Sequence, residues 1–261
     1  MLTMAGRAAR QASLESYVLH HYDWSESSLI LDLFTREQGR IAVAAKGAKR
    51  PFSQLRSVLL PFQRLHVMLG RESPGDESRE VHALRAADWA GGHAMLTGPA
   101  LFSGFYVNEL LMKLLARHDP HPKLFDIYGE TIAALGRADE AATQAALRAF
   151  EIILLREIGL LPELATETAS RRPVVATRRY LVLADAGVVE DEGGAEATAS
   201  GATLLALQAA LAGGDLGALQ RASADALAEL RPLLRTQLHY HLGSTQLRTR
   251  QVMIEAQALD R

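Results

Sequence analysis

The stretch SLILDLFTREQGRIAVAAKGAKRPFSQLRSVLLPF, residues 28–62, decides the fold of the amino-terminal part of the chain. Every second residue from Leu29 to Leu33 is leucine, which is the alternation of a β-strand with one buried face. Gln38-Gly39 breaks this run, and IAVAA at 41–45 resumes it. The stretch therefore predicts a β-hairpin whose second strand is bracketed by Arg40 and Lys46.

A basic segment, KGAKRP at 46–51, follows the hairpin. Gly47 and Pro51 prevent regular structure there, so three cations are expected to project from a turn. Such a segment is either an ordinary solvated turn or a phosphate-binding surface. Binding by counterion release needs several cations acting together, and further arginines lie nearby in the sequence, so phosphate binding is the reading to test.

The hairpin belongs to a set of five expected strands within about 75 residues. Besides the hairpin, these strands span residues 15–22, 58–69 and 79–85. A flexible connection rich in glycine and serine precedes the last one, and the set ends at Asp88-Trp89. This arrangement suits a small closed barrel of the kind that binds oligonucleotides. Residues 1–14 show no periodicity and are expected to be a flexible extension.

Helical periodicity begins after Ala90-Gly91-Gly92. Helices are expected within 95–118, 123–135 and 139–158, and again between 201 and 241. Between them, residues 161–198 hold one β-like run, 180–183, in polar and glycine-rich surroundings, which predicts a small inserted β-hairpin module. The fold class is therefore α+β. The expected divisions are 1–14, the barrel at 15–89, the helical domain at 90–160 and 199–261, and the inserted module at 161–198.

Composition excludes several classes of protein. The chain has no cysteine, so disulfides, thiolate nucleophiles and cysteine zinc sites are impossible. It has no apolar run of about 18 residues and no secretory signal, so we expect neither a membrane span nor export, and place the protein in the cytoplasm. No phosphate loop, nucleophile elbow or zinc-protease motif is present, and the histidines are not spaced as ligands. We expect no catalytic residue, metal, cofactor or small-molecule substrate.

Charge is distributed unevenly although the net formal charge is only −2. Residues 36–71 contain eight cations against Glu37 alone, a local charge of +7. Residues 91–169 contain six cations against ten acidic residues, a local charge of −4. The barrel could therefore meet a polyanion while the helical part stays acidic.

Several phrases, in order and spacing, resemble the RecO family of bacterial recombination and repair proteins, over most of the chain. They are YVLH at 17–20, WSESSL at 24–29, AKGA at 45–48, LPF at 60–62, LR at 84–85, LFSGFYVNELL at 101–111, ALRAFE at 146–151, and Gly243 with LRTR at 247–250. The resemblance implies an oligonucleotide-binding (OB-fold) barrel, a helical domain and an inserted module. Many relatives carry a four-cysteine zinc site in that module, and this chain has none. Zinc is not carried over, so the module must hold together by packing.

The resemblance also implies a non-enzymatic function in recombinational DNA repair, in association with the nucleoid. A RecO-like protein binds single- and double-stranded DNA, anneals complementary strands, and works with RecR so that RecA can load onto strands coated by single-strand-binding protein (SSB). The candidate DNA-binding residues are Arg40, Lys46, Lys49, Arg50, Arg56 and Arg64, with Phe52 as the aromatic residue placed to stack on bases. Phe34 and Phe62 lie in apolar strands and are expected in the core.

Arg148 lies where the family motif has an arginine that binds the acidic carboxy-terminal tail of SSB. A half-buried arginine beside an apolar groove suits a peptide that ends in an aromatic residue and a carboxylate. An ion pair with Glu151 or another acid is the competing explanation.

Two other functions remain open at this stage. The charge pattern also fits an OB-fold adaptor that binds RNA or ribosomal partners, and competition between DNA and RNA of matched sequence would separate these readings. A small-molecule enzyme would require a polar constellation converging in a deep cleft, which the sequence does not indicate.

Overall fold

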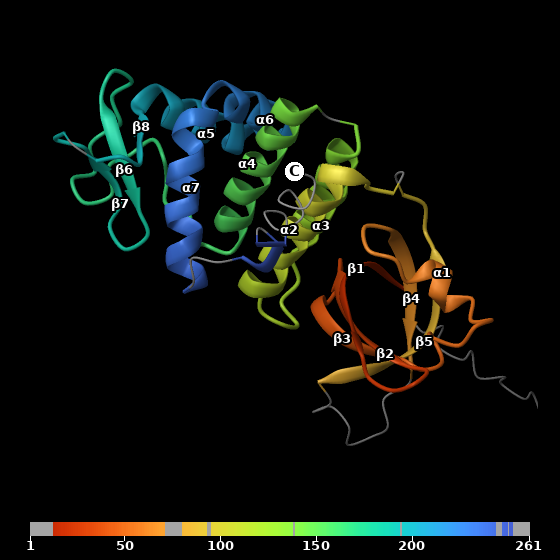
Figure 1. Cartoon of the computed structure of the whole chain (residues 1–261). Coiled ribbons are helices and arrows are strands. Elements are labelled where there is room, and N and C mark those ends of the chain that lie inside the picture. The colour runs from red at the N-terminus through yellow and green to blue at the C-terminus, as the bar shows by residue number, and fades with distance from the viewer. Residues whose placement is uncertain are drawn as a thin grey trace, which may run out of the picture. The chain divides into compact units, whose positions relative to one another are not determined.

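The computed structural model describes residues 13–70, 80–92, 95–137, 139–193, 195–243, 247–249 and 251–252. The chain forms two compact units (Figure 1). The barrel unit comprises Met1–Gly92 and Arg117–Pro120, and the helical unit comprises His93–Ala116 and His121–Arg261. Nearly all of the expected amino-terminal extension, and the connection at 71–79, lie outside the described residues.

Five strands close the barrel in the order β1-β2-β3-β5-β4, which confirms the architecture expected from the sequence. They are β1 (Leu14–Asp23), β2 (Leu29–Thr35), β3 (Gly39–Ala45), β4 (Arg64–Leu69) and β5 (Val81–Trp89). Neighbouring strands are antiparallel, except that β3 and β5 pair in parallel.

Alternation places one face of each strand in the barrel core, as the sequence predicts. The core includes Leu31, Leu33, Ile41, Val43, Leu65 and Val67. The opposite face of β3 is also covered, since Ala42 and Ala44 are buried. The small-residue face between Arg40 and Lys46 is therefore closed to solvent, and it offers no open surface for a ligand.

The long strand expected at 58–69 was wrong. Residues Leu55–Val58 form a short helix, α1, and the strand begins only at Arg64. Pro61 has no N–H to donate to a sheet, and Phe62 has a positive φ of 67°, so the chain cannot stay extended there. Within β4 itself, the alternation is as expected: Leu65 and Val67 are buried and His66 is exposed.

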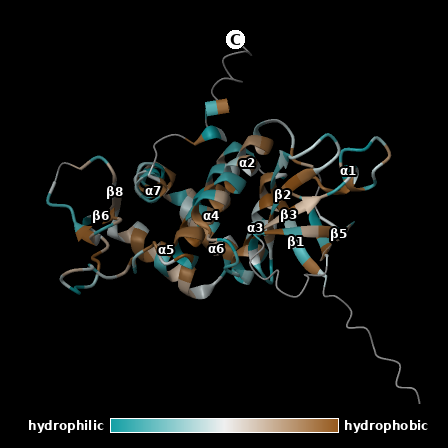
Figure 2. Ribbon diagram, turned by 90° about the horizontal axis from the view of Figure 1, so that it is seen from below, coloured by the Kyte–Doolittle hydropathy of each residue, from teal (hydrophilic) through white to brown (hydrophobic). Residues whose placement is uncertain are grey.

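Helices make up most of the second unit. They are α2 (Gly98–Leu114), α3 (Pro122–Leu135), α4 (Glu140–Glu157), α5 (Gly201–Gly213), α6 (Leu216–Asp225) and α7 (Leu227–Leu242). Helix α4 is central: it packs against α2, α3, α6 and α7, and its residues Ala149–Leu155 are all buried. Asp139 caps it by accepting the N–H of Ala142 at 2.8 Å. Helix α5 is largely apolar, as its colouring in Figure 2 shows.

The inserted module is a three-stranded sheet in the order β7-β6-β8, where the sequence predicted a hairpin. Its strands are β6 (Arg179–Leu183), β7 (Gly187–Glu190) and β8 (Thr198–Ser200). The β6–β7 hairpin agrees with the expectation. The third strand was missed because three residues are too few to show an alternation. Among the described helices, none is both long and apolar enough to cross a membrane.

Candidate functional site

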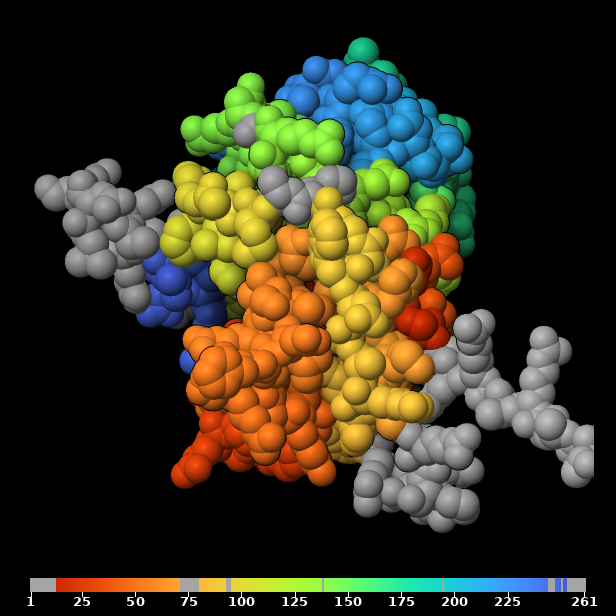
Figure 3. Space-filling model, turned by 90° about the vertical axis from the view of Figure 1, so that its right-hand side faces the viewer, coloured from red at the N-terminus to blue at the C-terminus, as the bar shows by residue number. Residues whose placement is uncertain are grey.

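The basic segment forms part of the surface of the barrel unit, where the orange atoms around residue 50 lie in Figure 3. It runs from the end of β3 through two successive turns into α1, because Arg50 N–H donates to Gly47 O and Ser53 N–H donates to Arg50 O. Lys46, Arg50 and Arg56 are all exposed. Their side chains make no ion pair or hydrogen bond with any residue that the structure describes, so nothing within the described chain neutralises them.

Lys49 has a different environment from its neighbours. Its Nζ lies 2.9 Å from Oδ1 of Asp23 and donates to the carbonyl of Ser25 at 3.2 Å. Its backbone N–H donates to the carbonyl of Ser27 at 3.0 Å. Lys49 therefore ties the basic segment to the turn between β1 and β2, and its charge is already paired.

Arg40 and Arg64 lie at the other end of the barrel. The strand register places Arg40 beside Phe34, Phe34 beside Tyr17, and Tyr17 beside Arg64, in a single row. Arg40 and Lys46 are six positions apart along an extended chain, which is about 20 Å at 3.3 Å per residue. Arg40 and Arg64 therefore cannot belong to one surface with the basic segment, and Phe34 and Tyr17, which lie between them in the row, are buried.

Carboxylates accompany both of these arginines. Arg40 Nε lies 3.4 Å from Oδ1 of Asp32, and Arg64 Nη2 donates to Oε2 of Glu15 at 2.8 Å. Burial raises the pKa of Asp32, and the charges of Arg40 and Arg117 oppose that rise. The two arginines thus have structural partners, which Lys46 and Arg50 do not have among the described residues.

Aromatic side chains separate into core and surface. Phe34 and Phe62 are buried, as expected. Phe52 is 99% exposed and lies two residues after Arg50, so its ring is close in sequence to the cations that would hold a nucleic-acid backbone.

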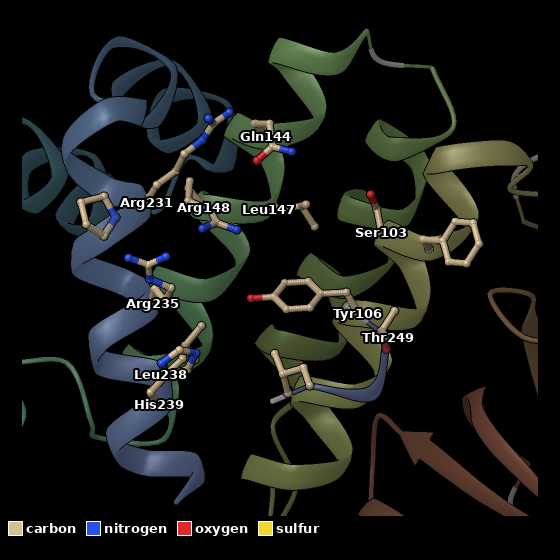
Figure 4. A pocket seen from close by; sticks show the side chains of 13 residues that line it. Ser103, Tyr106, Gln144, Leu147, Arg148, Arg231, Arg235, Leu238, His239 and Thr249 are labelled. Atoms are coloured by element: carbon tan, nitrogen blue, oxygen red, sulfur yellow. The ribbon is translucent and has the colours of Figure 1, made fainter. Parts of the chain in front are cut away.

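A second candidate site is a cavity of about 380 Å³ within the helical unit. Helices α2, α4 and α7 line it together with Leu247 and Thr249 (Figure 4). Apolar side chains such as Phe102, Leu147 and Leu238 form much of the wall. Three arginines, Arg148, Arg231 and Arg235, supply positive charge at the same cavity.

Arg148 is held by a buried carboxylate. Its Nη2 lies 2.6 Å from Oε1 of Glu151, and the hydroxyl of Tyr106 donates to the same oxygen at 2.6 Å. Burial raises the pKa of Glu151, and burial and the nearby Glu151 raise that of Tyr106 well above its usual value. The ion pair that competed with peptide binding in the sequence therefore exists. The guanidinium nevertheless points into the cavity, toward Arg235 (Figure 4).

Arg231 and Arg235 are cavity residues that the sequence analysis did not single out. They lie one turn apart on α7, and neither side chain has an ion pair or hydrogen bond with the chain as far as it is described. The sequence marks the region around them as basic, since residues 231–250 contain four arginines and no acidic residue, but it does not indicate a cavity. Arg250 itself lies outside the described residues.

Metal binding has no support among the described residues, where no group of three or more His, Asp or Glu side chains could hold an ion. His20 and His21 stack on one another, with ring centroids 6.0 Å apart, without a third potential ligand.

Comparisons with known proteins cover both units. The family model "Recombination protein O N terminal" matches residues 10–88, and "Recombination protein O C terminal" matches residues 95–251. The chain is 50% identical over 246 residues to the DNA repair protein RecO of Polaromonas naphthalenivorans, covering 94% of this chain and 96% of that protein. It is 48% identical over 255 residues to the RecO of Verminephrobacter eiseniae, covering 97% and 99%. It is 49% identical over 263 residues to that of Variovorax paradoxus, covering 97% and 99%.

Proposed function

The chain belongs to the RecO family of recombination and DNA repair proteins, and from this premise we propose that it acts as a mediator of recombinational repair. In this function it binds single- and double-stranded DNA, anneals complementary strands, and promotes RecA loading together with RecR and SSB. The observation that carries the proposal is the presence of three exposed cations, Lys46, Arg50 and Arg56, without intramolecular partners in the described chain, on one segment of the barrel.

The DNA backbone is the ligand that this segment fits. Cations spaced along a turn and a short helix contact successive phosphates without reading bases, so we propose weak sequence preference. Lys46, Arg50 and Arg56 supply the contacts, Lys49 shapes the loop, and Phe52 adds a stacking surface. Arg40 and Arg64 remain candidates for separate DNA contacts. Such contacts would cost free energy, because DNA phosphates would have to displace Asp32 from Arg40 and Glu15 from Arg64.

The cavity of the helical unit is proposed to bind the acidic tail of SSB. A peptide that ends in an aromatic residue needs an apolar recess for the ring and cations for its carboxylates. The apolar wall of the cavity provides the recess for the ring, and Arg231 and Arg235, beside Arg148, provide the cations. Because Glu151 neutralises Arg148, the two arginines of α7 carry the charge that is available to a peptide.

A salt titration tests the DNA proposal. The variant Lys46→Gln/Arg50→Gln should bind a single-stranded oligonucleotide more weakly, and the magnitude of its slope of log K against log salt should fall by about 1.4, since each lost phosphate contact on a single strand removes about 0.7. Arg221→Gln is the control, because Arg221 is an exposed cation of the helical unit. An unchanged slope removes the segment from the mechanism. RNA of matched sequence, used as competitor, decides between DNA and the RNA-binding alternative.

The tail proposal needs a separate measurement. Arg231→Gln/Arg235→Gln should weaken binding of an acidic peptide with a terminal phenylalanine, while leaving affinity for naked DNA unchanged. Equal loss of both affinities would point to a folding defect, and unchanged peptide binding would remove the cavity from the proposal.

A further inference from the structure

Trp24 is an exposed aromatic residue with no assigned function, at the same end of the barrel as the basic segment. We propose that Trp24, together with Phe52, forms a base-stacking platform that makes this end of the barrel prefer single-stranded over double-stranded DNA. The inference rests on the proposed function and goes further, since it names the residue that discriminates between the two forms of DNA.

Topology places Trp24 next to the cations. Strands β1 and β2 are antiparallel, as are β2 and β3, so the turn after β1 and the loop after β3 meet at one end of the barrel. The strand register confirms this neighbourhood, because Leu29 of β2 pairs with Asp23 at the end of β1 and with Ala45 at the end of β3. Trp24 follows Asp23, and Lys46 follows Ala45.

The turn that carries Trp24 is held in place on both sides. Lys49 contacts Asp23 Oδ1 and the carbonyls of Ser25 and Ser27, at 2.9, 3.2 and 3.0 Å. The N–H of Trp24 donates to the carbonyl of Ser28 at 3.2 Å. The backbone around Trp24 is therefore fixed to the basic segment, so a base that stacks on the indole would lie within reach of the cations that hold its phosphate.

The aromatic surfaces themselves are unused. Trp24 is 56% exposed and Phe52 is 99% exposed. Neither ring has a ring contact or side-chain hydrogen bond within the described chain. Single exposed apolar residues are common. Here, however, Phe52 lies three residues after Lys49, and Trp24 lies between Asp23 and Ser25, which Lys49 contacts. Two exposed rings beside unpaired cations match the composition of single-strand binding surfaces.

Stacking explains the expected discrimination. Bases of a duplex are already stacked and paired, so a duplex can use only the cations, whereas an unpaired strand can use both cations and rings. Each base stacked on an aromatic side chain contributes about 1–3 kcal/mol, which is about 5- to 150-fold in affinity.

The chain has only two tryptophans, which permits a direct spectroscopic test. Trp89 lies at the other end of the barrel, because it pairs with Leu65, which pairs in turn with Ser16 near the start of β1. Its Nε1 donates to Oε1 of Gln63 at 3.2 Å. Trp89→Phe leaves Trp24 as the sole indole, and an oligo(dT) strand should then quench its fluorescence, while a duplex of equal length should not. Trp24→Phe leaves Trp89 alone and should show no quenching by either form.

Affinities complete the test. Trp24→Ala should lower affinity for oligo(dT) at least about fivefold and leave duplex affinity within twofold, and Trp24→Phe should retain most of the single-strand affinity. Tyr240→Ala, which removes an exposed ring of the helical unit, is the control and should change neither. Equal quenching by single strand and duplex, or unchanged single-strand affinity of Trp24→Ala, would overturn the inference while leaving DNA binding intact. Failure of the wild-type protein to bind either form would instead overturn the proposed function.

Discussion

Arg148 Nη2 and Glu151 Oε1 lie 2.6 Å apart inside the helical unit, so the arginine at the proposed peptide site is paired with a fully buried carboxylate three residues away on the same helix. The arginine cannot be removed without leaving that carboxylate uncompensated. Its contribution to binding and its contribution to folding are therefore coupled, and a single substitution cannot separate them.

We predict that Arg148→Met lowers the free energy of unfolding by about 3 kcal/mol, because one partner of a buried ion pair is left alone. Arg148→Met/Glu151→Gln should regain most of this loss, since it removes both charges and keeps an acceptor for Tyr106. Urea unfolding of the two variants measures the difference. The double variant then shows what Arg148 contributes to peptide affinity in a folded protein. Equal stability of the wild type and the single variant would mean that the pair does not stabilise the fold.

Glu229 is one of the residues that join the inserted module to the helices. Its carboxylate accepts the N–H of Ser200 at 3.0 Å, the hydroxyl of Thr203 at 2.7 Å and Arg179 Nη1 at 3.2 Å. Glu229→Ala should cost about 2 kcal/mol, since the half-buried donors of Ser200 and Thr203 lose their acceptor together with Arg179. Glu190→Ala is the matched control: it removes a glutamate whose partner, Arg178, is 52% exposed, and should cost about 0.5 kcal/mol. Equal effects in thermal unfolding would refute this account of the module.

Gly39 has a role that no other residue type can fill. It has a φ of +67°, and a Cβ there would lie 2.0 Å from the carbonyl oxygen of Asp119, in a segment of the same unit. Gly39→Ala should therefore destabilise the protein by more than the roughly 1–2 kcal/mol of backbone strain alone. Gly91→Ala isolates that strain, because Gly91 also has a positive φ but has no atom within 4 Å of an added Cβ. Comparable unfolding midpoints for the two variants would show that the 117–120 segment moves away freely.

The sequence predicted most of the barrel because its signal is local. Alternation between Leu29 and Ala45 identifies strands that pair with their neighbours, and glycine marks the turn between β2 and β3. Pro61 was the only sequence signal for the break before β4, and the break also depends on the positive φ of Phe62, a conformation uncommon for a residue other than glycine and not visible in the sequence.

The sites were predicted less completely because their residues are brought together by tertiary contacts. Nothing near Lys49 in the sequence indicates that Asp23 pairs with it, and so the difference between Lys49 and Lys46 was not visible. Likewise, Arg231 and Arg235 join Arg148 only because α7 packs against α4.

Glu109 connects helix α2 to the carboxy-terminal residues at the cavity wall. Its Oε1 accepts the N–H of Arg248 at 2.9 Å, and its Oε2 accepts the N–H and the hydroxyl of Thr249 at 2.9 and 2.6 Å. Burial acts to raise the pKa of Glu109, but these hydrogen bonds outweigh it, so the pKa lies below its ordinary value of 4.5. The ionised carboxylate is thus the form that stabilises this contact.

A depressed pKa in the folded state gives a stabilisation that is complete above pH 4.5 and is lost as the pH falls through the folded pKa. Glu109→Gln should therefore be less stable than the wild type at neutral pH, and the difference should shrink below pH 4.5. Urea unfolding across this range measures it, with Glu130→Gln, at an exposed position of α3, as the control. Because Thr249 lines the cavity, faster hydrogen exchange at Arg248 and Thr249 in Glu109→Gln should accompany weaker peptide binding at neutral pH. Unchanged exchange at these two amides would mean that Glu109 does not hold the cavity wall, whatever its effect on stability.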